Sequence, residues 1–90
     1  MITVADIQKA IVAYFPSLKI SDLYSSSRTK SVVIPRQIAM YLCRQLTNMS
    51  LMDIGKSFGG RDHTTVIHAL NKIDEAILTD PEFNRVIKQL

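Results

Sequence analysis

The residues best suited to recognition chemistry stand together in one short segment, Gly59 to Thr65, which reads GGRDHTT. Its second half carries a carboxylate, an imidazole and two hydroxyls on four consecutive small side chains. These groups suit the polar edges of bases in the DNA major groove, and a threonine methyl can pack on the thymine methyl. We therefore predict that Asp62, His63, Thr64 and Thr65 contact bases.

Two residues of the segment also have a structural interpretation. The Asp62 carboxylate can cap the following helix by accepting hydrogen bonds from the free N–H groups of its first turn, with or without a base contact. Arg61, just before that helix, can contact a phosphate or can lock the turn through Asp62. The sequence is compatible with both roles for each residue.

The histidines and the single cysteine raise the question of a metal or catalytic site. His63 and His68 are five residues apart, which separates them by about 140° around a helix, so they cannot easily share one ion. Cys43 alone does not complete a zinc ligand set. It borders the apolar stripe of its helix, which indicates a small core residue. We expect no metal site, no Cys–His nucleophile and no enzymatic activity.

A helix-turn-helix is the element that would position the recognition segment. Ser50 followed by Asp53 is typical of a capping box and predicts a short helix over 51–58. The two glycines that follow allow a left-handed cap and a tight reversal. The next helix carries an apolar stripe of Val66, Ala69, Leu70, Ile73 and Ile77. This order predicts a helix-turn-helix over about 50–78, whose second helix enters the major groove.

The rest of the chain predicts further helices and no convincing strand. Thr3 and Asp6 resemble another capping box. Pro35 belongs in a first helical turn, where its missing N–H costs least, so a helix is expected from there to about Leu46. The expected helices cover residues 4–15, 21–24, 35–46, 51–58, a long segment after Asp62, and 81–90. We predict one all-α domain over 1–90 with about six helices.

Positive charge is concentrated in the middle of the chain. Between Arg28 and Lys72 there are seven basic and two acidic residues, a net charge of +5, whereas the two flanks together carry −2. This distribution suits a polyanionic partner such as nucleic acid, although it is also compatible with a solvated basic face.

A polar loop over residues 25–31 carries Arg28 and Lys30. The loop is either a solvated basic loop or an arm that reaches the minor groove, where arginine senses groove width and negative potential. Downstream, Arg36, Gln37 and Arg44 predict phosphate contacts, which position a protein on DNA without specifying sequence.

Composition excludes several other classes of protein. Hydrophobic residues make up 47% of the chain, which is typical of a folded domain. The apolar runs are too short and too often interrupted to span a bilayer, and no signal-peptide pattern opens the chain. One cysteine excludes an internal disulfide framework and fits a reducing cytosol.

Two stretches resemble the DnaA family of bacterial replication initiators. They are Ile54 to Ala69, which reads IGKSFGGRDHTTVIHA, and Pro35 to Arg44, which reads PRQIAMYLCR. The resemblance covers essentially the whole chain and corresponds to the family's C-terminal DNA-binding domain. It implies a Trp-repressor-like helical fold and binding to DnaA boxes at the replication origin. The chain departs from the family at Met52, where many members have proline, and at Ser25–Ser27, which is less basic than in many relatives.

The resemblance also implies roles for individual residues. Base contacts are expected in the major groove from Asp62, His63, Thr64 and Thr65, and in the minor groove from Arg28. Contacts with the DNA backbone are expected from Lys30, Arg36, Gln37, Arg44, Thr47, Arg61, His68 and Lys72.

Cofactors and partners follow from the same resemblance. The chain has no GxxxxGK[ST] phosphate loop. ATP and Mg²⁺ are therefore expected only in the family's ATPase module, which is absent from this chain. The expected partner is double-stranded DNA. Other DnaA protomers would bind through absent domains, and acidic phospholipids are a further candidate partner. We expect the domain to be monomeric, cytoplasmic and associated with the nucleoid. The alternatives are a helix-turn-helix transcription regulator and an interaction module that docks an acidic protein.

Overall fold

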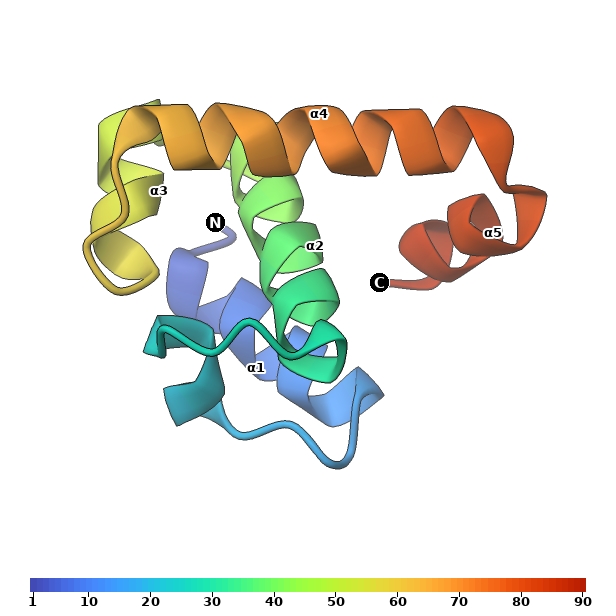
Figure 1. Cartoon of the computed structure of the whole chain (residues 1–90), viewed down its shortest axis with the longest axis horizontal. Helices are drawn as coiled ribbons and strands as arrows, with labels where there is room; N and C mark the ends of the chain where they lie inside the picture. Colours follow the sequence, from blue (N-terminus) through green and yellow to red (C-terminus); the bar gives the residue numbers. More distant parts are fainter.

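The computed structural model describes all 90 residues and contains only helices (Figure 1). In chain order these are α1 (Val4–Tyr14), the 3-10 helix η1 (Ile20–Tyr24), α2 (Lys30–Leu46), α3 (Leu51–Ser57), α4 (His63–Thr79) and α5 (Pro81–Gln89). The prediction of an all-α chain with about six helices is confirmed. None of these helices combines the length and the apolar character needed to cross a membrane.

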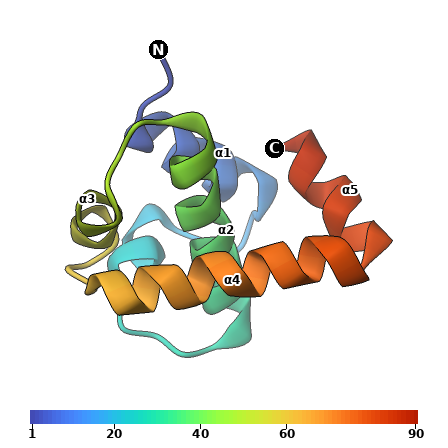
Figure 2. The same cartoon turned by 90° about the horizontal axis from the view of Figure 1, so that it is seen from above.

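The helix α2 forms the centre of the molecule, and α4 runs across its end (Figure 1). Seen from above, α3 lies at one end of α4 and α5 at the other (Figure 2). The core has fifteen buried apolar residues, among them Ile38 and Met40 of α2, Val66 of α4 and Phe58 after α3. Because α2 and α4 share this core, the orientation of α4 is fixed by apolar packing along its inner side.

Side-chain caps fix where most of the helices begin. Thr3 and Asp6 form the predicted capping box before α1, with hydrogen bonds of 3.2 and 3.0 Å. Before α3, the Ser50 hydroxyl accepts from the Asp53 N–H at 3.1 Å, but the return bond from the Ser50 N–H to the Asp53 carboxylate is absent. The second predicted capping box is therefore only half formed.

The prediction that α2 begins at Pro35 is wrong, because the helix begins at Lys30. The N–H groups of Val32 and Val33 both donate to the Thr29 carbonyl, at 2.9 and 2.8 Å, and so start the helix before the proline. Both valines are half-buried, and Val32 packs against the core. Apolar packing thus extends the helix through residues whose local preference is for strand, and Pro35 is accommodated inside it.

Candidate nucleic-acid interface

The turn between α3 and α4 is built around one carbonyl group. The Gly55 carbonyl accepts from the N–H groups of Phe58 at 3.2 Å, Gly60 at 3.0 Å and Arg61 at 2.9 Å. Gly59 and Gly60 have φ angles of 90° and 76°, a left-handed conformation that side chains disfavour. The predicted glycine reversal is confirmed, and it brings the chain back against α3.

Gly55 is a structural residue that the sequence analysis missed. A Cβ atom at this position would overlap the carbonyl oxygen of Arg61 and would lie 3.0 Å from its carbonyl carbon. The backbone of the turn therefore packs directly on the backbone of α3. An isolated glycine within a helical pattern was the available signal, because it costs helix stability and so indicates a packing or functional reason.

The first turn of α4 presents four polar side chains to solvent. Asp62 lies at the N-cap, where its carboxylate accepts from the Thr65 N–H at 2.8 Å. Asp62, His63, Thr64 and Thr65 are all exposed, and the next residue, Val66, is completely buried. The core thus anchors the helix immediately after the exposed turn, which gives the four side chains a rigid support.

The N-cap role of Asp62 is confirmed, and it leads to a prediction about stability. The hydrogen bond from the Thr65 backbone N–H lowers the pKa of the Asp62 carboxyl, so the carboxylate stabilises the folded state above the unfolded pKa of about 3.9. We expect Asp62→Ala to lower the Tm at pH 7, and the difference from wild type to disappear as the pH falls through the folded pKa. Melting curves followed by circular dichroism between pH 7 and pH 2 would check this.

Asp62→Asn is the matched control, because asparagine caps helices about as well as aspartate. It should keep the Tm near the wild-type value at pH 7. A Tm as low as that of Asp62→Ala would show that the carboxylate acts on α4 through something other than its N-cap hydrogen bond.

Arg28, in the loop before α2, and Lys30, the first residue of α2, are exposed. Two serine side chains bind the backbone of this loop. The Ser25 hydroxyl donates to the Asp22 carbonyl at 2.9 Å and accepts from the Ser27 N–H at 3.3 Å. The Ser27 hydroxyl accepts in turn from the Thr29 N–H at 3.3 Å. Ser25 and Ser27, two of the serines that make this loop less basic, thus form hydrogen bonds with its backbone.

Two arginines bind this loop to the rest of the interface. The Arg36 guanidinium donates to the carbonyls of Ser25 at 3.1 Å and Ser27 at 3.0 Å. The Arg61 guanidinium donates to the carbonyls of Ser25 and Phe58. Of the two roles considered for Arg61, locking the turn through Asp62 is wrong, because its guanidinium binds carbonyl groups. Arg36 is only 7% exposed, and no local sequence pattern indicates these bonds.

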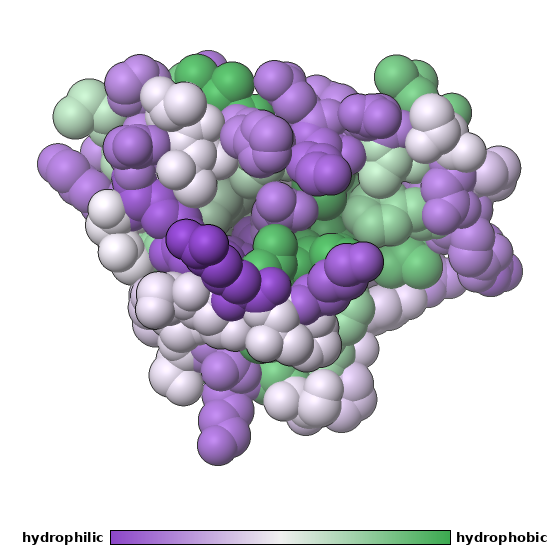
Figure 3. All heavy atoms as spheres, viewed as in Figure 1, coloured by the Kyte–Doolittle hydropathy of each residue, from purple (hydrophilic) through white to green (hydrophobic).

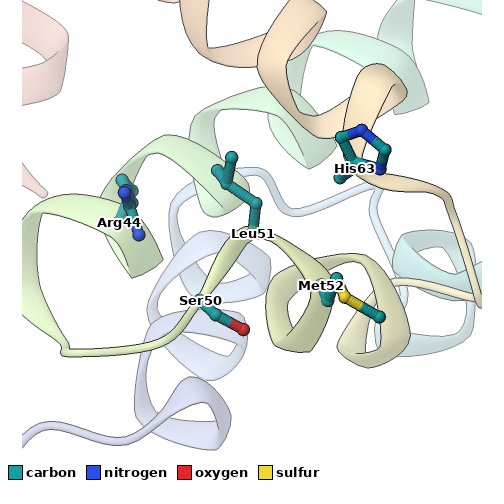
Figure 4. Close-up of a pocket in the computed structure, with 5 residues that line it drawn as sticks. All are labelled: Arg44, Ser50, Leu51, Met52 and His63. Atoms are coloured by element: carbon teal, nitrogen blue, oxygen red, sulfur yellow. The ribbon is translucent and has the colours of Figure 1, made fainter.

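The remaining predicted backbone contacts lie in two groups around α4. Arg44, near the end of α2, faces a hollow that is also lined by Ser50 and His63 (Figure 4). Thr47 is nearby, and its hydroxyl donates to the Cys43 carbonyl.

The second group lies farther along the helix. Gln37 and Lys72 line a hollow between α2, α4 and α5, which has an apolar floor that includes Ile73 and Phe83. A hydrophobic strip is visible in this region among hydrophilic side chains (Figure 3). His68 and Lys72 are both exposed on α4.

A comparison with known protein families identifies the family of this helix-turn-helix. The family described as "Bacterial dnaA protein helix-turn-helix" matches residues 4–73, from the start of α1 into α4. The chain belongs to the DnaA family. This membership agrees with a role of the helix-turn-helix in DNA binding during replication initiation.

Two named relatives match nearly the whole length of the chain. The chain is 54% identical to the chromosomal replication initiator protein DnaA of Wolbachia sp. subsp. Brugia malayi (strain TRS), over 99% of its length. It is 49% identical to the protein of the same name from Treponema denticola, again over 99%. In both cases the chain spans 19% of the relative's length.

A solved structure supports the same fold for the DnaA domain. The crystal structure of a DNA replication initiation factor superposes with a TM-score of 0.83 at 34% sequence identity. The superposition covers 94% of this chain and 26% of that one. The predicted helix-turn-helix fold is thereby confirmed.

The departure at Met52 leaves the first helix of the DnaA motif intact. Met52 lies in the first turn of α3 and is 62% exposed, so it does not contribute to the core. Ser50 still supplies the N-cap, and the helix begins at Leu51. The cap therefore sets the start of α3 without the rigid φ angle that proline would provide.

Cysteine and histidine chemistry has no support in the geometry of the DnaA domain. Cys43 is completely buried, and this burial raises the pKa of its thiol to about 11. A buried thiol with such a pKa stays protonated at neutral pH, and the thiolate is the nucleophilic form. No group of three or more His, Cys, Asp or Glu side chains is placed to hold a metal ion.

Proposed function

We propose that this DnaA domain binds duplex DNA at DnaA boxes and reads their sequence with the first turn of α4. The observation that carries the proposal is the row of exposed side chains from Asp62 to Thr65, held in place by the buried Val66. In a helix-turn-helix, the N-terminal residues of the second helix reach the base edges. Hydroxyl, imidazole and carboxylate groups supply the donors and acceptors that this readout needs.

The charge and exposure of the surrounding residues support this orientation on DNA. Arg28 would enter the adjacent minor groove, since it is exposed at the end of the ordered loop. The exposed side chains of Lys30, Arg44, His68 and Lys72 would contact phosphates, together with the half-buried Gln37 and Thr47. Such contacts supply affinity and fix the register of the helix in the groove.

The proposal assigns to this domain the step that selects the origin during replication initiation. Nucleotide binding is assigned to other parts of the longer family members, because no phosphate-loop motif occurs in these 90 residues.

The test is a titration of the domain with a DnaA-box duplex and with a duplex of scrambled sequence, followed by fluorescence anisotropy. We expect the box to bind at least about 10³-fold more tightly, as is typical of specific DNA-binding proteins. Equal affinity for the two duplexes would overturn the proposal. It would favour a module whose basic face docks an acidic protein.

We also expect the affinity for the box to depend strongly on salt. Each phosphate that the domain neutralises releases counterions and contributes a slope of about −0.9 to a plot of log K against log salt concentration. The exposed cations Arg28, Lys30, Arg44 and Lys72 are the main groups expected to contribute. Titrations between 50 and 200 mM salt would measure the slope, and an affinity independent of salt would contradict these contacts.

A further inference from the structure

We propose that Arg36 and Arg61 act as positioning residues, which fix the Arg28 loop against the turn of the helix-turn-helix. We call the two guanidinium groups and the carbonyls of Ser25, Ser27 and Phe58 the loop clamp. The inference rests on the proposed function, and it adds a specific claim. The clamp sets the offset between the minor-groove arginine and the base-reading turn of α4, so that both grooves are read in one register.

The Ser25 carbonyl is the point at which the loop clamp joins three parts of the fold. It accepts from Arg36 of α2 at 3.1 Å and also from Arg61 of the turn. A carbonyl oxygen has two lone pairs, so it can accept from both donors at once. Each guanidinium uses a second nitrogen to bind another carbonyl, that of Ser27 or of Phe58. This bridging requires the planar, forked donor group of arginine, which lysine lacks.

The backbone contact beneath the clamp strengthens the same connection. A Cβ atom at Gly59 would overlap the Tyr24 carbonyl oxygen and would lie 3.1 Å from its carbonyl carbon. The turn and the start of the loop therefore touch without any intervening side chain. A shift of one would displace the other.

The path from the clamp to the proposed DNA contacts is short on both sides. Arg28 directly follows Ser27, whose carbonyl is bound by Arg36 and whose hydroxyl binds the Thr29 N–H. On the other side, Arg61 directly precedes Asp62, the N-cap of α4. The two proposed reading elements are thus attached to opposite sides of one hydrogen-bonded unit.

Charge supports a positioning role for the clamp. Neither arginine has an acidic partner, because the one ion pair of the molecule joins Arg85 and Glu82. Burial lowers the pKa of both guanidiniums, and the nearby charge of Arg61 lowers that of Arg36 further. Partial burial of two cations beside one carbonyl costs desolvation free energy, so stability alone is a poor explanation for the pair. Their hydrogen bonds are directional, unlike a hydrophobic contact, and set the distance between the two backbone segments.

A double-mutant cycle distinguishes positioning from direct phosphate contact by Arg61. The proteins are the wild type, Arg28→Ala, Arg61→Lys and the double variant, each titrated with the box duplex. Loss of the Arg28 contact should weaken binding by roughly 5- to 150-fold. If Arg61 acts through Arg28, Arg61→Lys loses a large part of that factor although its charge is kept. The double variant then binds about as well as Arg28→Ala alone.

Direct phosphate contact gives the opposite pattern and would overturn the inference. Lysine would replace arginine with little loss, or the two losses would multiply in the double variant. Lys72→Ala is the matched control, because Lys72 is an exposed cation of α4 outside the clamp. The factor by which Lys72→Ala weakens binding should multiply with the factor for Arg28→Ala.

Two further measurements keep the test decisive. Circular dichroism melting establishes that each variant is folded at the titration temperature, and Arg36→Lys repeats the cycle from the other side of the clamp if Arg61→Lys is unfolded. The scrambled duplex separates the two proposals. No preference by the wild-type domain overturns the proposed function and the clamp with it, whereas a preference without coupling overturns the clamp alone.

Discussion

Replacing Gly55 with alanine should destabilise the domain by about 3 kcal/mol, at the upper end of the usual cost of overpacking. The added Cβ would overlap the Arg61 carbonyl oxygen, and this oxygen is backbone and cannot rotate away. Relief requires the turn to move off α3, which breaks the hydrogen bonds that Gly60 and Arg61 donate to the Gly55 carbonyl. The result would run against helix propensity, which favours alanine over glycine by up to about 1 kcal/mol.

Urea unfolding of Gly55→Ala beside Gly60→Ala would isolate the steric effect. Gly60 also has a positive φ angle, but a Cβ atom there would meet no atom within 4 Å. Its substitution should cost only the roughly 1–2 kcal/mol of a left-handed side-chain-bearing residue. Were Gly55→Ala as stable as the wild type, the close packing of the turn on α3 would be refuted.

Replacing Thr65 with alanine should weaken binding to the box by about 1–3 kcal/mol and leave binding to a scrambled duplex nearly unchanged. Thr65 is exposed, so a base can reach its hydroxyl and methyl groups. Its backbone N–H, which Asp62 binds, is retained in the variant. Alanine is also the better helix former, so a loss of affinity would not reflect unfolding. Anisotropy titrations with both duplexes give the two affinities.

Lys72→Ala supplies the comparison for this experiment. An exposed lysine that contacts a phosphate should weaken both duplexes about equally and reduce the salt slope by about 1. If Thr65→Ala behaved in this way, Thr65 would serve the DNA backbone and base readout would have to come from the other residues of the turn.

Local patterns predicted most of the helices and the recognition segment. Caps and glycines act on residues close in sequence, so Asp62 and the turn at Gly59–Gly60 could be recognised without any knowledge of the fold. The apolar stripe of α4 likewise reflects a local period, and Val66, Ala69 and Ile73 are indeed its buried members.

The features that the sequence analysis missed depend on contacts between distant residues. The start of α2 at Lys30 depends on the packing of Val32 against the core, which outweighs the local preference. The bonds of Arg61 to the Ser25 carbonyl, and of the buried Gln8 side chain to the Ser57 carbonyl, join segments 36 and 49 residues apart. Charge and periodicity carry no information about such partners, so Arg36 and Arg61 could be recognised only as basic residues.

The burial of Cys43 makes its thiol a probe for the opening of the hydrophobic core. The side chain is completely enclosed on the central helix α2, and its thiol is protonated at neutral pH. A thiol reagent can therefore modify it only after α2 separates from its neighbours. Because the chain has no other cysteine, the rate of labelling measures how often the core opens and does not depend on motions of the surface. If DNA binds only the folded domain, the labelling rate should be lower with DNA than without it.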